Sequence, residues 1–73
     1  MESSLLVKRY KVSSSIIKSI GYLNNTIEIE YMNGSVYKYF DTSVQTYAEI
    51  IRATSVGATS KKLLKGKKFV KID

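Results

Sequence analysis

The sequence contains no cysteine, histidine, tryptophan or proline. Without thiols or imidazoles the chain cannot build a disulfide framework, a Cys/His zinc site, a cysteine nucleophile or a histidine general base. A metal site would need carboxylates and carbonyls, and the six acidic residues lack the spacing of a calcium-binding loop. We therefore expect a protein with no enzymatic activity, no cofactor and no metal.

Long apolar runs are scarce as well. The apolar stretch near the N-terminus, Leu5 to Val7, is three residues long and is followed by Lys8 and Arg9. A signal peptide needs about 7 to 15 apolar residues and a membrane span about 18 or more. We therefore expect no export, no membrane span and a cytoplasmic location, with which the lack of cysteine agrees.

The charge is strongly positive and unevenly placed. The 73 residues carry twelve Lys and Arg against six Asp and Glu, for a net charge of +6. Residues 61–73 hold six lysines against one aspartate, whereas residues 12–60 hold three basic and four acidic side chains. With 44% hydrophobic and 25% charged residues, the chain is typical of one small globular domain. The sequence predicts a flexible basic N-terminal segment over residues 1–11 and a single domain over 12–73, with a basic C-terminal element over 61–73.

The middle of the chain has the pattern of antiparallel strands. Residues 15–23 are rich in strand-forming side chains, with Gly21 as a candidate bulge, and the paired asparagines that follow supply a turn. Residues 26–32 alternate between apolar and polar side chains. The apolar members that share one face are Ile27, Ile29 and Tyr31.

The next turn sets the register of a hairpin. Asn33 with Gly34 is a strong hairpin signal, and residues 36–40 form the returning strand. A two-residue loop would oppose Met32 to Ser35 and place a lysine beside an isoleucine on the apolar face, whereas a three-residue loop ending in a bulge opposes Met32 to Val36. We prefer the second register because it groups tyrosines with isoleucines and pairs opposite charges. Its pairs are Tyr31 with Tyr37, Ile29 with Tyr39 and Glu30 with Lys38.

The period then changes to that of helices. Apolar residues recur at helical spacing over residues 43–53, behind a capping box formed by Thr42 and Gln45. A second, short helix is expected over residues 59–65, before the chain ends. The predicted fold class is α+β: a three-stranded antiparallel β-meander packed against one helix, then a short second helix and a terminal extended segment.

Four features, in this order along the chain, carry a family resemblance. They are Gly21-Tyr22 at a strand end, the alternating run Ile27 to Tyr31, Tyr37-Lys38-Tyr39, and Ser55-Val56-Gly57. In these features, and over roughly residues 12–69, the chain resembles the KTSC domain, which occurs as small stand-alone bacterial and phage proteins and at the C-terminus of some lysyl-tRNA synthetases. The resemblance implies a small α+β domain with a proposed RNA-binding role and no known enzyme activity.

The C-terminal lysines are the main candidates for a binding site. Lys61, Lys62 and Lys65 lie on adjacent turns of the expected short helix, and Lys67 and Lys68 follow it. A charge run is usually a solvated, solubilising surface, but the density of lysine here also favours phosphate contacts. Because lysine is a point charge and does not read bases through paired hydrogen bonds, as arginine does, we expect weak sequence preference.

Tyr37 and Tyr39 have two interpretations. Exposed aromatic rings on a sheet stack on unpaired bases, whereas buried rings fill the core. A chain with no tryptophan and two phenylalanines needs other large side chains in its core. The preferred hairpin register therefore favours a core role, and the shorter loop would favour base stacking.

The leading prediction is a non-enzymatic module that binds RNA or another nucleic acid through its phosphates. The alternative is a small phage or bacterial inhibitor or adaptor that binds an acidic protein surface or sequesters a nucleotide ligand. A basic stripe would suit a polymer, whereas a basic pocket would suit a compact anion. Because so small a core often gains stability from association, a homo-oligomer is a further expectation.

Overall fold

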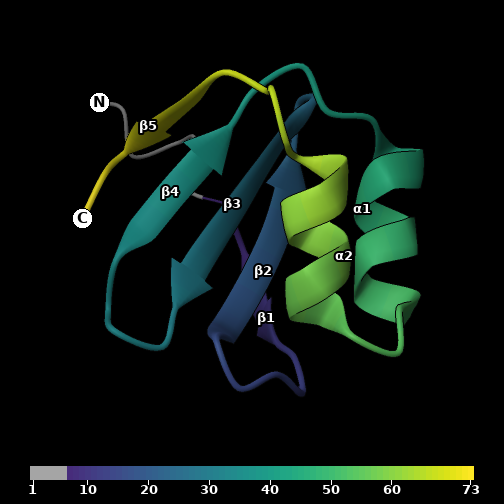
Figure 1. Ribbon diagram of the computed structural model, residues 1–73. Helices are drawn as coiled ribbons and strands as arrows, with labels where there is room; N and C mark the ends of the chain where they lie inside the picture. Colours follow the sequence, from purple (N-terminus) through teal and green to yellow (C-terminus); the bar gives the residue numbers. More distant parts are fainter. Residues whose placement is uncertain (1–6) are drawn as a thin grey trace.

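Five antiparallel strands form one sheet in the computed structural model, which describes residues 7–73 (Figure 1). The sheet has the order β1-β2-β3-β4-β5, so strands that follow one another in the chain lie side by side. Two helices stand between β4 and β5 in the chain and pack on one face of the sheet. The elements are β1 (Arg9–Lys11), β2 (Ile17–Leu23), β3 (Thr26–Tyr31), β4 (Val36–Tyr39), α1 (Val44–Arg52), α2 (Val56–Leu63) and β5 (Phe69–Lys71).

The α+β class is confirmed, but the prediction of a three-stranded sheet is wrong because two edge strands, β1 and β5, extend it to five. β1 lies in the N-terminal range 1–11, which was expected to be a flexible basic segment; residues 1–6 of that range lie outside the described residues. β5 turns the terminal extended segment into a partner of β4. Each strand is only three residues long and carries basic side chains, which are typical of sheet edges protected from aggregation. Three residues are too few for an alternating pattern to be recognised in the sequence.

The hairpin between β3 and β4 has a three-residue loop, as expected, but the loop lies one residue earlier than predicted. The Tyr31 amide donates to the Ser35 carbonyl oxygen at 2.8 Å, and the Gly34 amide donates to the Tyr31 carbonyl oxygen at 2.9 Å. Gly34 closes the loop with a φ of 93°, in the left-handed region that favours glycine. The pairs are therefore shifted by two residues while the faces are kept: Ile29 with Tyr37, Ile27 with Tyr39 and Glu28 with Lys38.

The irregularity in β2 also differs from the prediction. The register shifts between Ile17 and Ser19, whereas Gly21 pairs regularly with Arg9 on one side and Glu28 on the other. Gly21 is required for a different reason. A Cβ at this position would collide with the Lys8 carbonyl oxygen, because the backbone just before β1 runs close over the strand.

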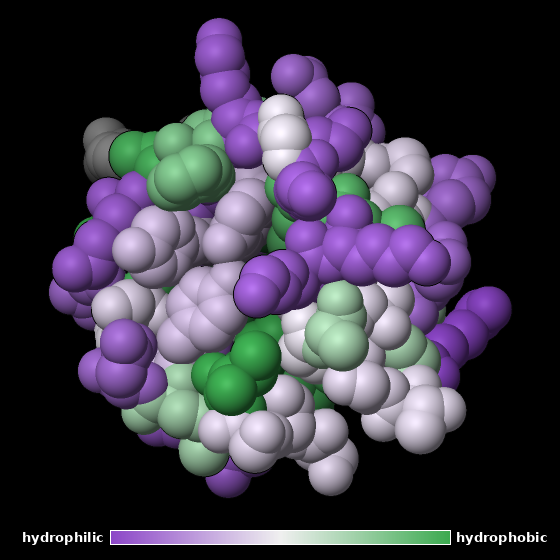
Figure 2. Space-filling view, in the orientation of Figure 1, coloured by the Kyte–Doolittle hydropathy of each residue, from purple (hydrophilic) through white to green (hydrophobic). Residues whose placement is uncertain are grey.

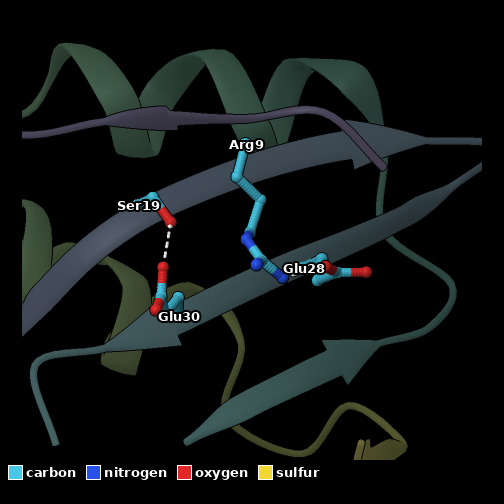
Figure 3. Close-up of polar contacts among 4 residues, drawn as sticks. All are labelled: Arg9, Ser19, Glu28 and Glu30. Atoms are coloured by element: carbon cyan, nitrogen blue, oxygen red, sulfur yellow. Dashed lines mark hydrogen bonds and ion pairs between the residues drawn. The ribbon is translucent and has the colours of Figure 1, made fainter. Parts of the chain in front are cut away.

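The bare surface at Gly21 lets one side chain cross the sheet. Arg9 extends from β1 over β2 and forms an ion pair with Glu28 on β3, on the face away from the helices (Figure 3). Glu28 is 5% exposed, so its charge needs this partner in the folded state. On the same face the Ser19 hydroxyl donates to a Glu30 carboxylate oxygen at 3.0 Å.

Both helices begin at a serine cap. The Ser43 hydroxyl accepts a hydrogen bond from the Thr46 amide and starts α1, so the predicted capping box at Thr42 lies one residue too early. The Ser55 hydroxyl accepts from the Ala58 amide and starts α2, three residues before the predicted start at residue 59. The late Ser-x-Gly motif is thus the first turn of a helix and not a loop.

The core lies between the helices and the central strands, and each buried isoleucine stabilises the fold by about 1.5 to 3 kcal/mol. The helices lie over the β1–β2 side of the sheet, whereas β4 and β5 extend beyond them (Figure 1). No helix within residues 7–73 is long and apolar enough to cross a membrane. The buried core residues are Ile17, Ile20, Ile27, Ile29, Ile50, Val56 and Leu64.

We predict that Gly21→Ala destabilises the domain by about 1 to 3 kcal/mol, the usual cost of forcing an extra methyl group into a closely packed site. The methyl group would push the Val7–Lys8 backbone away and disturb the path of Arg9 to Glu28. Urea unfolding measures the change, with Lys18→Ala on the exposed part of the same strand as the control. Equal stability of Gly21→Ala and the parent would contradict the close approach.

Candidate nucleic-acid interface

Four aromatic rings form a continuous surface, the aromatic patch, on the uncovered part of the helix-facing side of the sheet. The ring centroids are 5.7 Å apart for Tyr31 and Tyr37, 6.3 Å for Tyr37 and Tyr39, and 5.8 Å for Phe69 with either Tyr37 or Tyr39. These distances are within the range of favourable aromatic contact. The strand register brings the rings together, because Tyr39 pairs with Phe69 and Tyr37 pairs with Lys71.

The aromatic patch is partly core and partly surface. Tyr31 and Tyr39 pack against the buried isoleucines, as the preferred interpretation expected for Tyr39, whereas Tyr37 does not belong to the core cluster. All three tyrosines are partly buried, and Phe69 is 60% exposed. The core interpretation and the stacking interpretation therefore each describe part of the patch. The rings nearest the helices complete the core, and the patch is open to solvent toward β5.

A cavity of about 390 Å³ opens between α2 and the aromatic patch. Lys61 on α2 and Lys65, which follows the C-cap Leu64, line it on the helix side, and the helix therefore ends two residues before the predicted end at residue 65. Figure 2 shows this face, where pale, weakly polar rings lie beside a small green apolar spot and are bordered by strongly hydrophilic side chains. The residues lining the cavity are Ile16, Tyr31, Tyr39, Gly57, Ser60, Lys61, Leu64 and Lys65.

The hydroxyls of Tyr31 and Tyr39 meet within this cavity, with their oxygens 2.7 Å apart. Burial raises the pKa of Tyr31 well above its ordinary value, and the hydrogen bond with Tyr39 raises it further. Both effects favour the neutral phenol. The Tyr31 hydroxyl in the cavity therefore stays neutral throughout the physiological range of pH.

The five lysines predicted to contact phosphate do not all lie at one site. Lys61 and Lys65 line the cavity, whereas Lys62 is exposed on α2 and is not part of its lining. The Lys67 ammonium donates to the Asp41 carbonyl oxygen at 2.6 Å. Lys68 is exposed just before β5, and its backbone carbonyl oxygen accepts from the Phe40 amide.

Two residues of this surface were absent from the predicted site. Phe69 adds the most exposed ring to the aromatic patch, and Lys71 adds a cation opposite Tyr37. The strand-forming residues Phe69 and Val70 were the one local signal for a strand whose ring would join those of Tyr37 and Tyr39. The surrounding lysines obscured this signal, because a charge run is usually assigned to solvent.

The two acidic side chains of the sheet lie on its opposite face. Glu28 is paired with Arg9, and Glu30 accepts from Ser19 and lies 3.9 Å from the Lys18 ammonium nitrogen (Figure 3). Among the described residues that line the 390 Å³ cavity there is no acid. The positive charges of Lys61 and Lys65 therefore have no acidic partner among these lining residues.

A larger cavity of about 630 Å³ lies on the other flank of the domain, between β1 and the helices. Its lining includes Tyr10, Tyr47 and Ile51, and Lys11 is the charged residue within it. One cation at a wide opening gives less electrostatic attraction for an anion than two lysines beside an aromatic surface. The smaller cavity is therefore the stronger candidate for an anionic ligand.

The open five-stranded antiparallel sheet with two helices on one face defines a small α+β domain. The sequence model of the KTSC domain matches residues 13–69, and the chain belongs to the KTSC domain family. The crystal structure of a KTSC domain protein from Yersinia pestis is similar, with a TM-score of 0.84 and 32% identity, covering 93% of this chain and 100% of that one. No protein with a curated description matches the chain.

The raised pKa of Tyr31 predicts a stability that falls in alkaline solution. The neutral phenol is favoured in the folded state, so its stabilising effect is complete below the ordinary pKa of 10.0 and is lost as the pH rises above that value. We expect Tyr31→Phe to lose less stability than the parent between about pH 8 and about pH 11. Some loss should remain in the variant because burial also raises the pKa of Tyr47. Urea unfolding at each pH measures this, and parallel losses in both proteins would contradict it.

Proposed function

We propose that this KTSC domain is a non-enzymatic module that binds nucleic acid, RNA above all, with lysines contacting phosphates and the aromatic patch contacting bases. One observation carries the proposal: Lys61 of α2 and Lys65 in the turn after it line the same cavity as Tyr31 and Tyr39. Cations beside exposed rings on a sheet are the combination that binds a polymer of phosphates and flat bases.

The cations are suited to a phosphate backbone. Each lysine offers a compact charge with three donors and no fixed hydrogen-bonding fork, so it attracts phosphate without selecting a base. Lys67 uses one donor on the Asp41 carbonyl oxygen and retains two, while Lys62 and Lys68 remain exposed to attract the chain at longer range. Binding should therefore be sensitive to salt and weakly dependent on sequence.

The placement of the cations supports a polymer over a compact anion. Lys61 lies on α2 and Lys65 in the turn that follows it, whereas Lys71 lies on β5 beyond the aromatic patch. A site for a compact anion gathers its cations around one point, whereas here they border a surface that crosses from the helix to the sheet edge.

We predict that Lys61→Ala/Lys65→Ala weakens the binding of single-stranded RNA about tenfold at roughly 0.1 M salt. The slope of log affinity against log salt should fall by about 1.4, because each single-strand phosphate contact contributes about 0.7. Fluorescence anisotropy with a labelled single strand measures both quantities.

The matched control is Lys18→Ala/Lys38→Ala, which removes two positive charges from β2 and β4 but lies on the opposite face of the sheet. It should retain most of the affinity. Equal losses in the two double variants would show attraction by net charge alone, and no binding of any nucleic acid at low salt would overturn the proposal. Capture of an acidic protein that survives nuclease treatment, together with that lack of binding, would favour the adaptor alternative.

A further inference from the structure

We infer that the 390 Å³ cavity between α2 and the aromatic patch holds one unstacked base of a single-stranded nucleic acid. This inference rests on the proposed function and adds to it a site for a single nucleobase, with selection against duplexes. Phosphate contacts alone would give the domain no reason to prefer one strand to two.

The size and walls of the cavity suit a flat heterocycle. Its volume of about 390 Å³ is within the range of roughly 300 to 1,000 Å³ that is typical of sites for small organic ligands. Leu64 and Ile16 provide apolar walls, and the rings of Tyr31 and Tyr39 provide aromatic ones. A base exposes such flat apolar faces only when it is unstacked.

The position of Ile16 is set by close packing against α2. A Cβ added at Gly57 would lie 2.7 Å from Ile16 Cδ1, so the absence of a side chain in this turn of α2 lets Ile16 lie against the helix. Ile16 is nevertheless 50% exposed, because it stands at the opening of the cavity and not in the core. It can therefore contact a ligand without being needed for folding.

The polar groups of the cavity match the edge of a base. Two hydroxyls that share one hydrogen bond retain a second hydrogen, so the Tyr31–Tyr39 pair can donate to a base carbonyl or ring nitrogen and can accept from an amino group. The Ser60 hydroxyl is already committed to the Gly57 carbonyl oxygen at 2.9 Å. One neutral donor with free acceptors accommodates every base, so the cavity selects for an accessible base and not for its identity.

The charges at the cavity place the backbone of the same nucleotide. Lys61 and Lys65 line one side, and none of the described lining residues is acidic, so a phosphate next to an inserted base meets two cations. In a duplex each base is stacked and paired, and entry would require its extrusion, which costs free energy that a single strand does not have to supply. The same lysines therefore bind a single strand more tightly than a duplex.

The first test compares three labelled RNAs of roughly ten nucleotides, a length within the site size of known single-strand binders. They are an oligouridylate, a duplex, and a single strand of abasic nucleotides that keeps the phosphates. We expect the oligouridylate to bind about tenfold more tightly than the other two, from the combined stacking and insertion of its bases. Equal affinity for all three would overturn the base site while leaving phosphate binding intact, whereas binding of none would refute the proposed function itself.

The second test fills the cavity from its opening. Ile16→Trp should weaken oligouridylate binding about fivefold by occupying the space of the base, with an unchanged salt slope because the lysines remain. Ile51→Trp is the matched control, since Ile51 is also an exposed isoleucine but lines the cavity on the other flank. Urea unfolding checks that both variants are folded. An Ile16→Trp variant that is folded and binds like the Ile51→Trp variant would contradict the inference.

Discussion

Incomplete cover of the sheet by two short helices is the constraint on which the rest of this structure depends. α1 and α2 have nine and eight residues, and they lie over the β1–β2 side of the sheet (Figure 1). They bury the isoleucines of the central strands, and they leave the helix-facing side of β4 and β5 uncovered. Tyr31 and Tyr39 stand at this boundary, so one part of each ring completes the core and another remains available. A longer helical layer would have closed the cavity and buried the aromatic patch.

The far face of the sheet complements this arrangement. Arg9 crosses β2 where Gly21 has no side chain and pairs with Glu28, which is buried on β3. Glu30 is held by Ser19 on the same face. Because these acids lie on the side away from the helices, they offset little of the lysine charge on α2 and β5. Lys61 and Lys65 therefore have no acidic neighbour among the described residues that line the 390 Å³ cavity.

Much of the fold could be predicted from local pattern, and the errors have physical causes. The side-chain period of a strand is two residues, so the hairpin could slip by two residues and still keep Tyr37 and Tyr39 on the isoleucine face. The helix start at Ser55 was missed because Gly57 signals a turn, and only the contact with Ile16 reveals why a glycine stands inside a helix. β1 was missed, and residues 69–72 could be read only as a terminal strand or an extended tail, because three-residue strands have no periodicity that distinguishes them from charged tails.

The sequence by itself determined the chemistry that is present and absent: no imidazole or thiol, an isoleucine-rich strand face, a Tyr-x-Tyr strand and a lysine-rich C-terminal element. These properties depend on composition and on neighbours along the chain. Only the tertiary structure decided that Lys61 and Lys65, but not Lys62, meet Tyr31 and Tyr39, and that Phe69 joins the aromatic patch. Those contacts join residues some twenty to forty positions apart, and they depend on where α2 packs on the sheet and on the pairing of β5 with β4, which no local pattern specifies.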